Sequence, residues 1–350
     1  MSRLEVSGGI RSRLAATVAA LRRPASYPGE EGPVEAVETH MAWVFLTATH
    51  AYKLKKPLRT GLIDWTTADA RRTSCEGELA LNRRLAAPVY RAVVPVARTG
   101  GGLRVGGEGP AVDWLVKMRR LPRVRMLDVC IARGTVPGPA VRQLAARLAA
   151  FYQRARPVGW SAARYRGRLA SNIRAKGAVL ECPHYGLDAS LSRAVGAALL
   201  RWMHAHASLL GGRAARVVDA HGDLRPEHVC LTVPPMVIDC LEFNRSLRLH
   251  DPVSDLSFLR LECDRLGAPG IGTQVLARYR DATGDTVAPR LIPFYESYHA
   301  LIRAVIAVWH IDDAQYPDPD VWRRQATTYL RLARARLERM ATGPPPDATA

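Results

Sequence analysis

Long apolar runs are missing from this 350-residue sequence, and so are several motifs that would assign it to a common class of protein. No apolar run approaches the roughly 18 residues that a membrane-spanning helix needs. The six cysteines are scattered without a C-x-x-C pair, which disfavours a disulfide framework and a tetrahedral zinc site. Neither a P-loop G-x-x-x-x-G-K-S/T nor a G-x-G-x-x-G occurs. We therefore expect a soluble protein of the reducing cytoplasm.

Acidic residues are scarce relative to basic ones, with 32 Asp and Glu against 50 Lys and Arg and a net charge of +18. Residues 110–180 contain 15 Lys or Arg but only two acids, Asp113 and Asp128. A positive field concentrated on one segment favours an anionic ligand or partner for that surface. The alternative is an arginine-rich helical surface that is merely solvated.

The length of the chain allows a sizeable core and favours two lobes or domains. Residues 1–33 indicate a short amphipathic helix, too short in its apolar part for a signal peptide, followed by a connector rich in Pro and Gly. We place a first lobe at 34–120 and a helical second lobe at 121–341. Residues 342–350, rich in Pro and small polar residues, are predicted to be a disordered tail.

The first lobe has the pattern of a small antiparallel sheet. Alternating apolar residues predict short strands at 34–40, 42–46 and 51–57, separated by turns. Two further strands are predicted at 93–96 and 112–118. The glycine-rich stretch between them precedes no helix, so we interpret it as a hairpin tip and not as a dinucleotide motif.

Beyond Arg120 the apolar spacing becomes helical, and the whole chain is predicted to be an α+β protein. Val141, Leu144, Leu148 and Phe151, for example, form one apolar stripe. The helices predicted in this part cover residues 128–133, 139–152, 162–180, 190–210, 253–265, 272–281, 292–311 and 321–340.

Carboxylates are concentrated between residues 221 and 255. The run H-G-D-L-R-P-E-H begins at His221, and an I-D pair ends at Asp239. Asp223 and Asp239 are 16 residues apart and flank two apolar triplets around Pro234 and Pro235, so a hairpin should bring both acids to one end. Two acids in one place suggest a divalent cation.

These motifs resemble the catalytic and metal loops of the protein-kinase-like fold, in the form used by aminoglycoside and choline phosphotransferases. The run I-D-C-L-E-F-N with a downstream D-P-x-x-D-L resembles an uncharacterised bacterial branch of the aminoglycoside phosphotransferase family. The resemblance implies a two-lobed fold with a small antiparallel sheet and a larger helical lobe. It also implies that Asp223 is the catalytic base, that Asp239 holds Mg²⁺ and that Arg225 neutralises the transferred phosphoryl group. Asp255 would orient the loop after the metal site.

One position departs from the pattern. His228 stands where the kinase loop has the Asn that binds a second metal ion, and imidazole is a poor ligand for Mg²⁺. Either one metal ion suffices, or Glu227, Glu242 or Asn244 supplies the missing oxygen.

The strand A-Y-K-L-K carries two candidates for the lysine that holds the α- and β-phosphates. Lys53 and Lys55 point to the same side of the strand, and the resemblance to A-I-K of kinases favours Lys53. A helix predicted at 67–85 then presents Glu78 beside apolar residues, where it could pair with the lysine. Glu76 competes with Glu78 for this role, and the alternative to an ion pair is a solvent-exposed helix glutamate.

The remaining nucleotide contacts follow from the resemblance. Because the glycine-rich loop is absent, the turn that contains Thr39 would cover the phosphates of ATP or GTP with backbone N–H groups and the Thr hydroxyl. The lobe connector would bind the purine through the backbone of Lys117, Met118 and Arg119. Side-chain identity carries little information at such positions.

The sequence therefore predicts a Mg²⁺-dependent phosphotransferase that moves the γ-phosphate of ATP or GTP to a hydroxyl of a small neutral or anionic metabolite. Aminoglycosides are polycations, and the basic segment 110–180 has the wrong sign for them. The alternative is a kinase-fold binding or regulatory protein with weak or no catalysis. It would contact nucleic acid through its arginine-rich helices, although the basic segment lacks interleaved aromatic residues. Neither interpretation involves a membrane.

Overall fold

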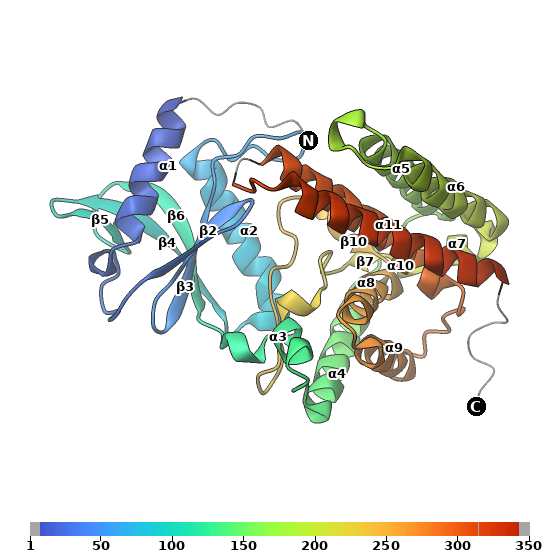
Figure 1. Cartoon of the computed structure of the whole chain (residues 1–350). Coiled ribbons are helices and arrows are strands. Elements are labelled where there is room, and N and C mark those ends of the chain that lie inside the picture. Colours follow the sequence, from blue (N-terminus) through green and yellow to red (C-terminus); the bar gives the residue numbers. More distant parts are fainter. Residues whose placement is uncertain (1–7, 314, 343–350) are drawn as a thin grey trace. The chain divides into compact units, whose positions relative to one another are not determined.

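The alternating strand patterns of the first lobe build a six-stranded antiparallel sheet, with strand order β1-β2-β3-β6-β4-β5 (Figure 1). The computed structural model describes residues 8–313 and 315–342. The strands are β1 Glu35–Glu38, β2 Ala42–Leu46, β3 His50–Lys55, β4 Tyr90–Thr99, β5 Gly102–Val105 and β6 Ala111–Arg119.

Strand β5 is a correction to the sequence prediction. The glycine-rich stretch was expected to be only a hairpin tip, yet residues 102–105 pair with the end of β4. Gly102 and Gly106 adopt positive φ values of 115° and 70°, which glycine tolerates at the strand ends. Between them, Leu103 and Val105 alternate with polar positions, which is enough for a short edge strand.

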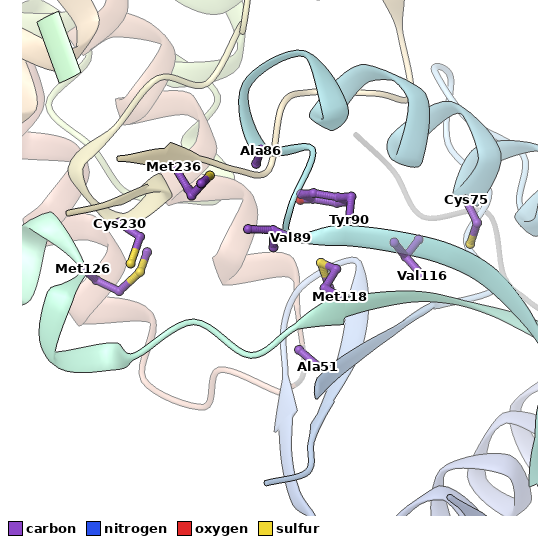
Figure 2. Packing of buried hydrophobic residues seen from close by; sticks show 10 residues of the cluster. All are labelled: Ala51, Cys75, Ala86, Val89, Tyr90, Val116, Met118, Met126, Cys230 and Met236. Atoms are coloured by element: carbon purple, nitrogen blue, oxygen red, sulfur yellow. The ribbon is translucent and has the colours of Figure 1, made fainter. Parts of the chain in front are cut away.

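The sheet is covered on both faces, as the alternation of its side chains requires. Leu115 packs in one cluster with Val18 of helix α1 (Gly8–Leu21), whereas its neighbour Val116 packs in another with Cys75 of helix α2 (Ala68–Ala86). Figure 2 shows the cluster on the α2 side. The sheet therefore has a helix on each face, and α2 begins where Thr67 accepts a hydrogen bond of 3.2 Å from the amide of Ala70.

A short hairpin from much later in the chain belongs to the same packing unit as the sheet. Its strands are β8 (Val229–Cys230) and β9 (Met236–Val237). Cys230 and Met236 are buried in the cluster of Figure 2, and the amide of Leu231 donates to the carbonyl of Arg125 at 2.7 Å. The loop that follows β9 is thereby held beside β3 and α2.

The described chain divides accordingly into two units. The first comprises Met1–Val129 with His228–Leu247, and the second Cys130–Glu227 with Arg248–Ala350. Residues 343–350 of the predicted tail lie outside the described residues.

The second unit is helical, as predicted. Helix α10 is at its centre: it packs against α5, α8 and α11 and is buried along most of its length. The predicted helix 190–210 is broken at His206, whose ψ of 35° ends α6. The helices are α4 Gly138–Arg154, α5 Ala162–Leu180, α6 Ala189–Ala205, α7 Ala207–Gly212, α8 Pro252–Arg265, α9 Pro269–Thr283, α10 Leu291–Trp309 and α11 Pro319–Thr342; α3 (Leu127–Ala132) links the two units along the chain.

Two strands of two residues each, β7 (Val218–Asp219) and β10 (Leu249–His250), pair within this unit. Single 3₁₀ turns connect many elements, at Pro24–Ser26, Arg123–Arg125, Pro183–Tyr185, Arg213–Arg216, Pro226–His228, Arg245–Arg248 and His310–Asp312. Among the described residues, no helix is both long enough and apolar enough to span a lipid bilayer.

A buried ion-pair network connects the segment before β7 with the residue that follows β10. The guanidinium of Arg213 donates to Asp251 and to Asp285, in each case at 2.7 Å. Asp251 also caps α8 by accepting from the amide of Val253 at 3.1 Å. Because these groups are buried, their mutual pairing satisfies charges that would otherwise be costly to desolvate.

Candidate active site

In the first unit, one buried carboxylate binds both candidate lysines. Lys53 and Lys55 are two positions apart on β3 and therefore point to the same face of the sheet, toward α2. Lys53 Nζ lies 3.0 Å from Glu78 Oε1, and Lys55 Nζ lies 2.6 Å from Glu78 Oε2. Glu78 is 0% exposed, whereas Glu76 is exposed and pairs with Arg72 on the same helix. The structure thus places Glu78, and not Glu76, beside the lysines.

The loop after β9 supplies a second carboxylate to each lysine. Lys53 Nζ lies 2.7 Å from Asp239 Oδ1, and Lys55 is paired with Glu242. Two ammonium groups and three carboxylates therefore form one cluster. The sequence did not indicate that Glu242 would contact Lys55; it was considered only as a source of oxygen for a metal ion.

The position of Asp239 is fixed by side chains at the end of α2 and the start of β4. The amide of Asp239 donates to the Tyr90 hydroxyl at 3.1 Å, and the amide of Cys240 donates to Asn82 Oδ1 at 2.8 Å. Asn82 is one helical turn after Glu78 and donates to its carbonyl at 3.0 Å. The same face of α2 thus carries both the carboxylate that binds the lysines and the amide that holds the loop. A role for Asn82 was not predicted from the sequence. Its position four residues after Glu78, on the same face of the helix, could have indicated one.

The electrostatics of the cluster favour its charged forms. Burial alone would lower the pKa of Lys53, but Asp239 and Glu78 raise it well above its ordinary value. Burial alone would raise the pKa of Asp239, but Lys53, with His228 as a smaller contribution, holds it far below its usual range. The pKa of Glu78 is lowered against the effect of burial by both lysines. All three groups are therefore ionised at neutral pH.

Asp239 is the member of the cluster best suited to a metal ion. Its side chain is 42% exposed, and its φ of 59° is the one positive value among the non-glycine residues that the structure describes. Strained backbone of this kind is typical of functional loops. Mg²⁺ commonly uses one or two carboxylates together with substrate phosphates, so Asp239 fits such an ion.

The second predicted metal position fits less well. His228 Nε2 lies 3.5 Å from Asp239 Oδ2, so the imidazole is a neighbour of the carboxylate but offers nitrogen where Mg²⁺ prefers oxygen. Of the alternatives, Glu242 is paired with Lys55, and Asn244 Oδ1 accepts from the amide of Ser246 at 2.9 Å. In the described part of the chain, no three His, Cys, Asp or Glu side chains are arranged to hold a metal ion by themselves.

The loop that carries Asp223 belongs to the second unit and is held by Asp255. Asp255, which is 0% exposed on α8, accepts hydrogen bonds from the amides of His221 and Gly222 at 2.9 and 3.2 Å. Tyr152 of α4 donates its hydroxyl to Asp255 Oδ2 at 2.8 Å. The loop that these contacts orient is therefore the one at His221, whereas the sequence placed the role of Asp255 at the loop after the metal site.

Within this loop Arg225 binds Asp223 through two contacts. Arg225 Nε lies 2.9 Å from Asp223 Oδ1, and Nη2 lies 3.1 Å from Oδ2. A third guanidinium nitrogen, Nη1, lies 3.5 Å from Glu227 Oε2. Burial alone would lower the pKa of Arg225, but the carboxylates of Asp223 and Glu227 raise it, so the guanidinium stays charged. A carboxylate and a fixed cation are thus positioned two residues apart.

Thr39 closes the turn between β1 and β2. Its hydroxyl donates to the carbonyl of Ala42 at 2.9 Å and accepts from the amide of Ala42 at 3.1 Å. The hydroxyl that was expected to face phosphate is therefore used within the turn itself.

The three residues predicted at the purine edge lie at the end of β6. Lys117 and Met118 are opposite Tyr52 and Ala51 of β3, and β4 pairs with them on the other side. Arg119 ends the strand. The backbone of this segment is part of the sheet, and the connector begins after it.

Comparison with curated sequences finds relatives in mycobacteria that are themselves named only as uncharacterised proteins. No family model matches the chain. An uncharacterised protein of Mycobacterium tuberculosis is 30% identical over 297 residues, which make up 80% of this chain and 56% of that protein. An uncharacterised protein of Mycobacterium bovis gives the same values. The chain therefore spans a little over half the length of the curated relatives that it matches.

Comparison with solved structures shows the fold. A choline/ethanolamine kinase family protein from Mesorhizobium loti is 16% identical, with a TM-score of 0.56 over 94% of this chain and 95% of that one. The GDP complex of aminoglycoside 2'-phosphotransferase-IIIa is also 16% identical, with a TM-score of 0.56 over 92% and 98%. A glucosamine kinase bound to glucosamine, ADP and phosphate is 14% identical, with a TM-score of 0.50 over 89% and 83%. The chain has the protein-kinase-like fold that these small-molecule kinases share, as the sequence predicted.

Proposed function

We propose that the protein is a phosphotransferase that moves the γ-phosphate of ATP or GTP to a hydroxyl of a small neutral or anionic metabolite. The observation that carries this proposal is the position of Lys53 Nζ, 3.0 Å from Glu78 and 2.7 Å from Asp239. A lysine fixed between a helix glutamate and a loop aspartate is the arrangement by which kinases hold nucleotide phosphates. The ADP and GDP bound by structural neighbours support a nucleotide as the donor.

The proposed reaction depends on positioning and charge, because phosphoryl transfer requires little covalent chemistry from the protein. Lys53 holds the α- and β-phosphates, and Glu78 keeps its ammonium in place. Asp223 orients the acceptor hydroxyl and accepts its proton. Arg225, held beside Asp223, neutralises charge on the transferred group.

Asp239 would hold Mg²⁺, with His228 beside it. When bound, the ion neutralises charge on the phosphate oxygens. The carboxylate of Asp239 is 42% exposed and lies 2.7 Å from Lys53 Nζ. The carboxylate would bind the metal ion, and the neighbouring ammonium would bind the phosphate. Glu242 binds Lys55 and keeps the loop on the sheet.

The acceptor is proposed to differ from those named for the structural neighbours. Aminoglycosides, choline and glucosamine carry positive charge, whereas residues 110–180 of this chain hold 15 Lys or Arg against two acids. Like charges disfavour a cationic acceptor on such a surface. A neutral or anionic acceptor avoids that repulsion.

The test is a screen of the purified chain for release of ADP or GDP over a panel of metabolites, with Asp223→Asn as the blank. Wild-type turnover should require Mg²⁺, and Asp223→Asn should lower kcat by roughly 10²- to 10⁴-fold while nucleotide binding persists. Equal turnover by the variant would contradict the role of Asp223. Nucleotide binding without any turnover would instead favour a kinase-fold regulatory protein, and efficient phosphorylation of kanamycin would refute the predicted acceptor class.

A further inference from the structure

Helix α5 carries a polar stripe along the border of its buried face. Arg164, Arg168, Asn172 and Lys176 follow one another at intervals of four residues and therefore share one side of the helix. Each is directly followed in the sequence by a buried residue of the same helix, namely Tyr165, Leu169, Ile173 and Gly177. The stripe is thus neither core nor fully solvated surface.

Neighbouring side chains hold this stripe in place. Asn172 donates to the hydroxyl of Tyr298 on α10 at 3.0 Å. The guanidinium groups of Arg164 and Arg168 lie 4.8 and 5.4 Å from the centre of the Trp160 ring. Aromatic stacking fixes the direction of these side chains without neutralising their charge.

Lys176 is half-buried but has no counter-ion among the described residues: no carboxylate lies within ion-pair distance of its ammonium, and no acceptor within hydrogen-bond distance. Burial lowers its pKa, and the nearby Arg168 lowers it further. Other buried cations of this unit are paired, such as Arg213 with Asp251 and Arg336 with Glu296. A desolvated cation without a partner is costly, and an incoming anion would remove that cost.

Contacts of α10 and α8, made around His299 of α10, connect the stripe to the loop at Asp223. His299 is 1% exposed, stacks on Phe258 with ring centres 4.6 Å apart, and has Nε2 3.0 Å from Ser254 Oγ. Burial is the main cause of its lowered pKa, while Asp223 raises that pKa and Lys176 lowers it. Asn172, one turn before Lys176, contacts Tyr298 beside His299, and Asp255, beside Ser254, accepts from the amides of His221 and Gly222 just before Asp223. These contacts link the α5 stripe to the loop at Asp223 through α10 and α8.

We infer that the acceptor substrate carries an anionic group, a carboxylate or a phosphate, which Lys176 and Arg168 bind while its hydroxyl is presented to Asp223. This inference rests on the proposed phosphotransferase function and narrows its acceptor from neutral or anionic to anionic. Lys176 acts as the point charge, and Arg168 supplies a planar donor pair suited to either oxyanion.

The first experiment compares acceptors that share a skeleton and differ in charge: glycerol, glycerate and glycerol 3-phosphate, and glucose, gluconate and glucose 6-phosphate. We expect the anionic members to be phosphorylated with the higher kcat/KM. The same comparison shows whether a carboxylate or a phosphate gives the higher kcat/KM. Lys176→Met should raise KM for the anionic acceptor roughly 10- to 100-fold, with kcat and the nucleotide KM little changed. Preference for the uncharged members, or an unchanged KM in Lys176→Met, would overturn the inference.

The matched control is Arg174→Met, which removes an exposed cation from the other side of α5. It lowers the net charge by the same amount and should leave KM for the anionic acceptor within about twofold of wild type. An equal rise in KM in both variants would mean that overall charge, and not a site at Lys176, selects the acceptor.

A binding measurement separates failure of this inference from failure of the proposed function. Inorganic phosphate is titrated calorimetrically into the whole chain, where no turnover is needed. Binding that weakens roughly 10- to 100-fold in Lys176→Met but not in Arg174→Met supports the anion site even if no acceptor is phosphorylated. Absent phosphate binding, or equal affinity in wild type and Lys176→Met, overturns it even if the protein is a kinase.

Thermal unfolding provides the check on a purely structural role. Because Lys176→Met removes a half-buried charge that has no counter-ion in the described structure, its Tm should equal or exceed that of wild type. A lower Tm together with lost phosphate binding would mean that Lys176 supports the fold instead of binding an anion.

Discussion

The ammonium of Lys55 lies 2.6 Å from Oε2 of Glu78, and both side chains are almost completely buried, at 1% and 0% exposure. The other oxygen of that carboxylate binds Lys53, which has 16% of its side chain exposed. One glutamate therefore joins an inner lysine and an outer lysine. The difference in exposure indicates different roles. Lys53, the outer lysine, can reach a ligand, whereas Lys55, the inner lysine, stabilises the cluster.

The first prediction separates these two roles. Lys55→Met should lower the free energy of unfolding by about 3–5 kcal/mol, because it leaves buried Glu78 and Glu242 without one of their cations. Lys53→Met should lower nucleotide turnover by about 100-fold or more while destabilising the protein less. Denaturant unfolding and steady-state kinetics on both variants check this, and the reverse ranking of stabilities would contradict it.

The second prediction concerns the two glutamates of α2. Glu78→Gln removes the charge that binds both lysines and should reduce both stability and nucleotide turnover. Glu76→Gln is its matched control, because Glu76 is exposed and pairs with Arg72, an exposed residue of the same helix. Its effect on stability should remain within about 0.5 kcal/mol. A loss of turnover in Glu76→Gln that equals the loss in Glu78→Gln would refute the assignment.

The meeting of Lys53 and Lys55 with Glu78 could be predicted from the local periodicity of the sequence. The alternation of β3 places Lys53 and Lys55 on one face, and the apolar spacing of α2 turns Glu78 inward, so their meeting could be expected from residues 51–85 alone. The sequence could not choose between the lysines, because both reach the same carboxylate. The choice depends on exposure, which is set by the loop at Asp239 and Glu242.

Contacts between segments far apart in the chain were not predictable. Asp255 was expected to orient a loop, but which loop it binds depends on how α8 packs, and its partners are 33 and 34 residues earlier. The hydrogen bond from Asn172 of the polar stripe to Tyr298 likewise depends on the packing of α5 against α10. The sequence indicated only that the segment was basic.

The third prediction uses the hydrogen bonds of Asp255. Asp255→Asn replaces one acceptor by an amide N–H group that faces the backbone N–H of His221 or Gly222, so the loop at Asp223 should shift. We expect kcat to fall about 10- to 100-fold with the nucleotide KM nearly unchanged, since Asp255 acts through the loop and not through the nucleotide. Tyr152→Phe removes one donor to the same carboxylate and should give a smaller loss.

Steady-state kinetics with the acceptor and the nucleotide varied separately measure the effect of Asp255→Asn. A change confined to the nucleotide KM would show that Asp255 does not position Asp223. Unfolding experiments on Tyr152→Phe provide the structural comparison, with an expected cost of about 1–3 kcal/mol for the lost buried hydrogen bond.

The last prediction is a pH dependence of stability that arises from His299. Burial, and then the neighbouring His250, lower the pKa of His299 well below its ordinary value of 6.5, against smaller raising effects from Ser254 and Asp223. Below pH 6.5 the unfolded chain therefore binds a proton that the folded protein excludes, so the free energy of unfolding should fall as the pH falls from about 7 toward 5. Above pH 7.5 this group should contribute no slope.

Replacing His299 by Gln keeps a partner for Ser254 and removes the titrating ring, so this part of the slope should disappear, although the lost stacking on Phe258 will lower stability at every pH. His184→Gln is the control, because the His184 side chain is 62% exposed and paired with Asp312 at the surface. Denaturant unfolding of the three proteins at pH 5, 6, 7 and 8 measures the slopes. A slope that His299→Gln leaves unchanged would mean that the imidazole takes up a proton as easily in the folded protein as in the unfolded chain. The assignment of His299 as a neutral, buried side chain would then be wrong.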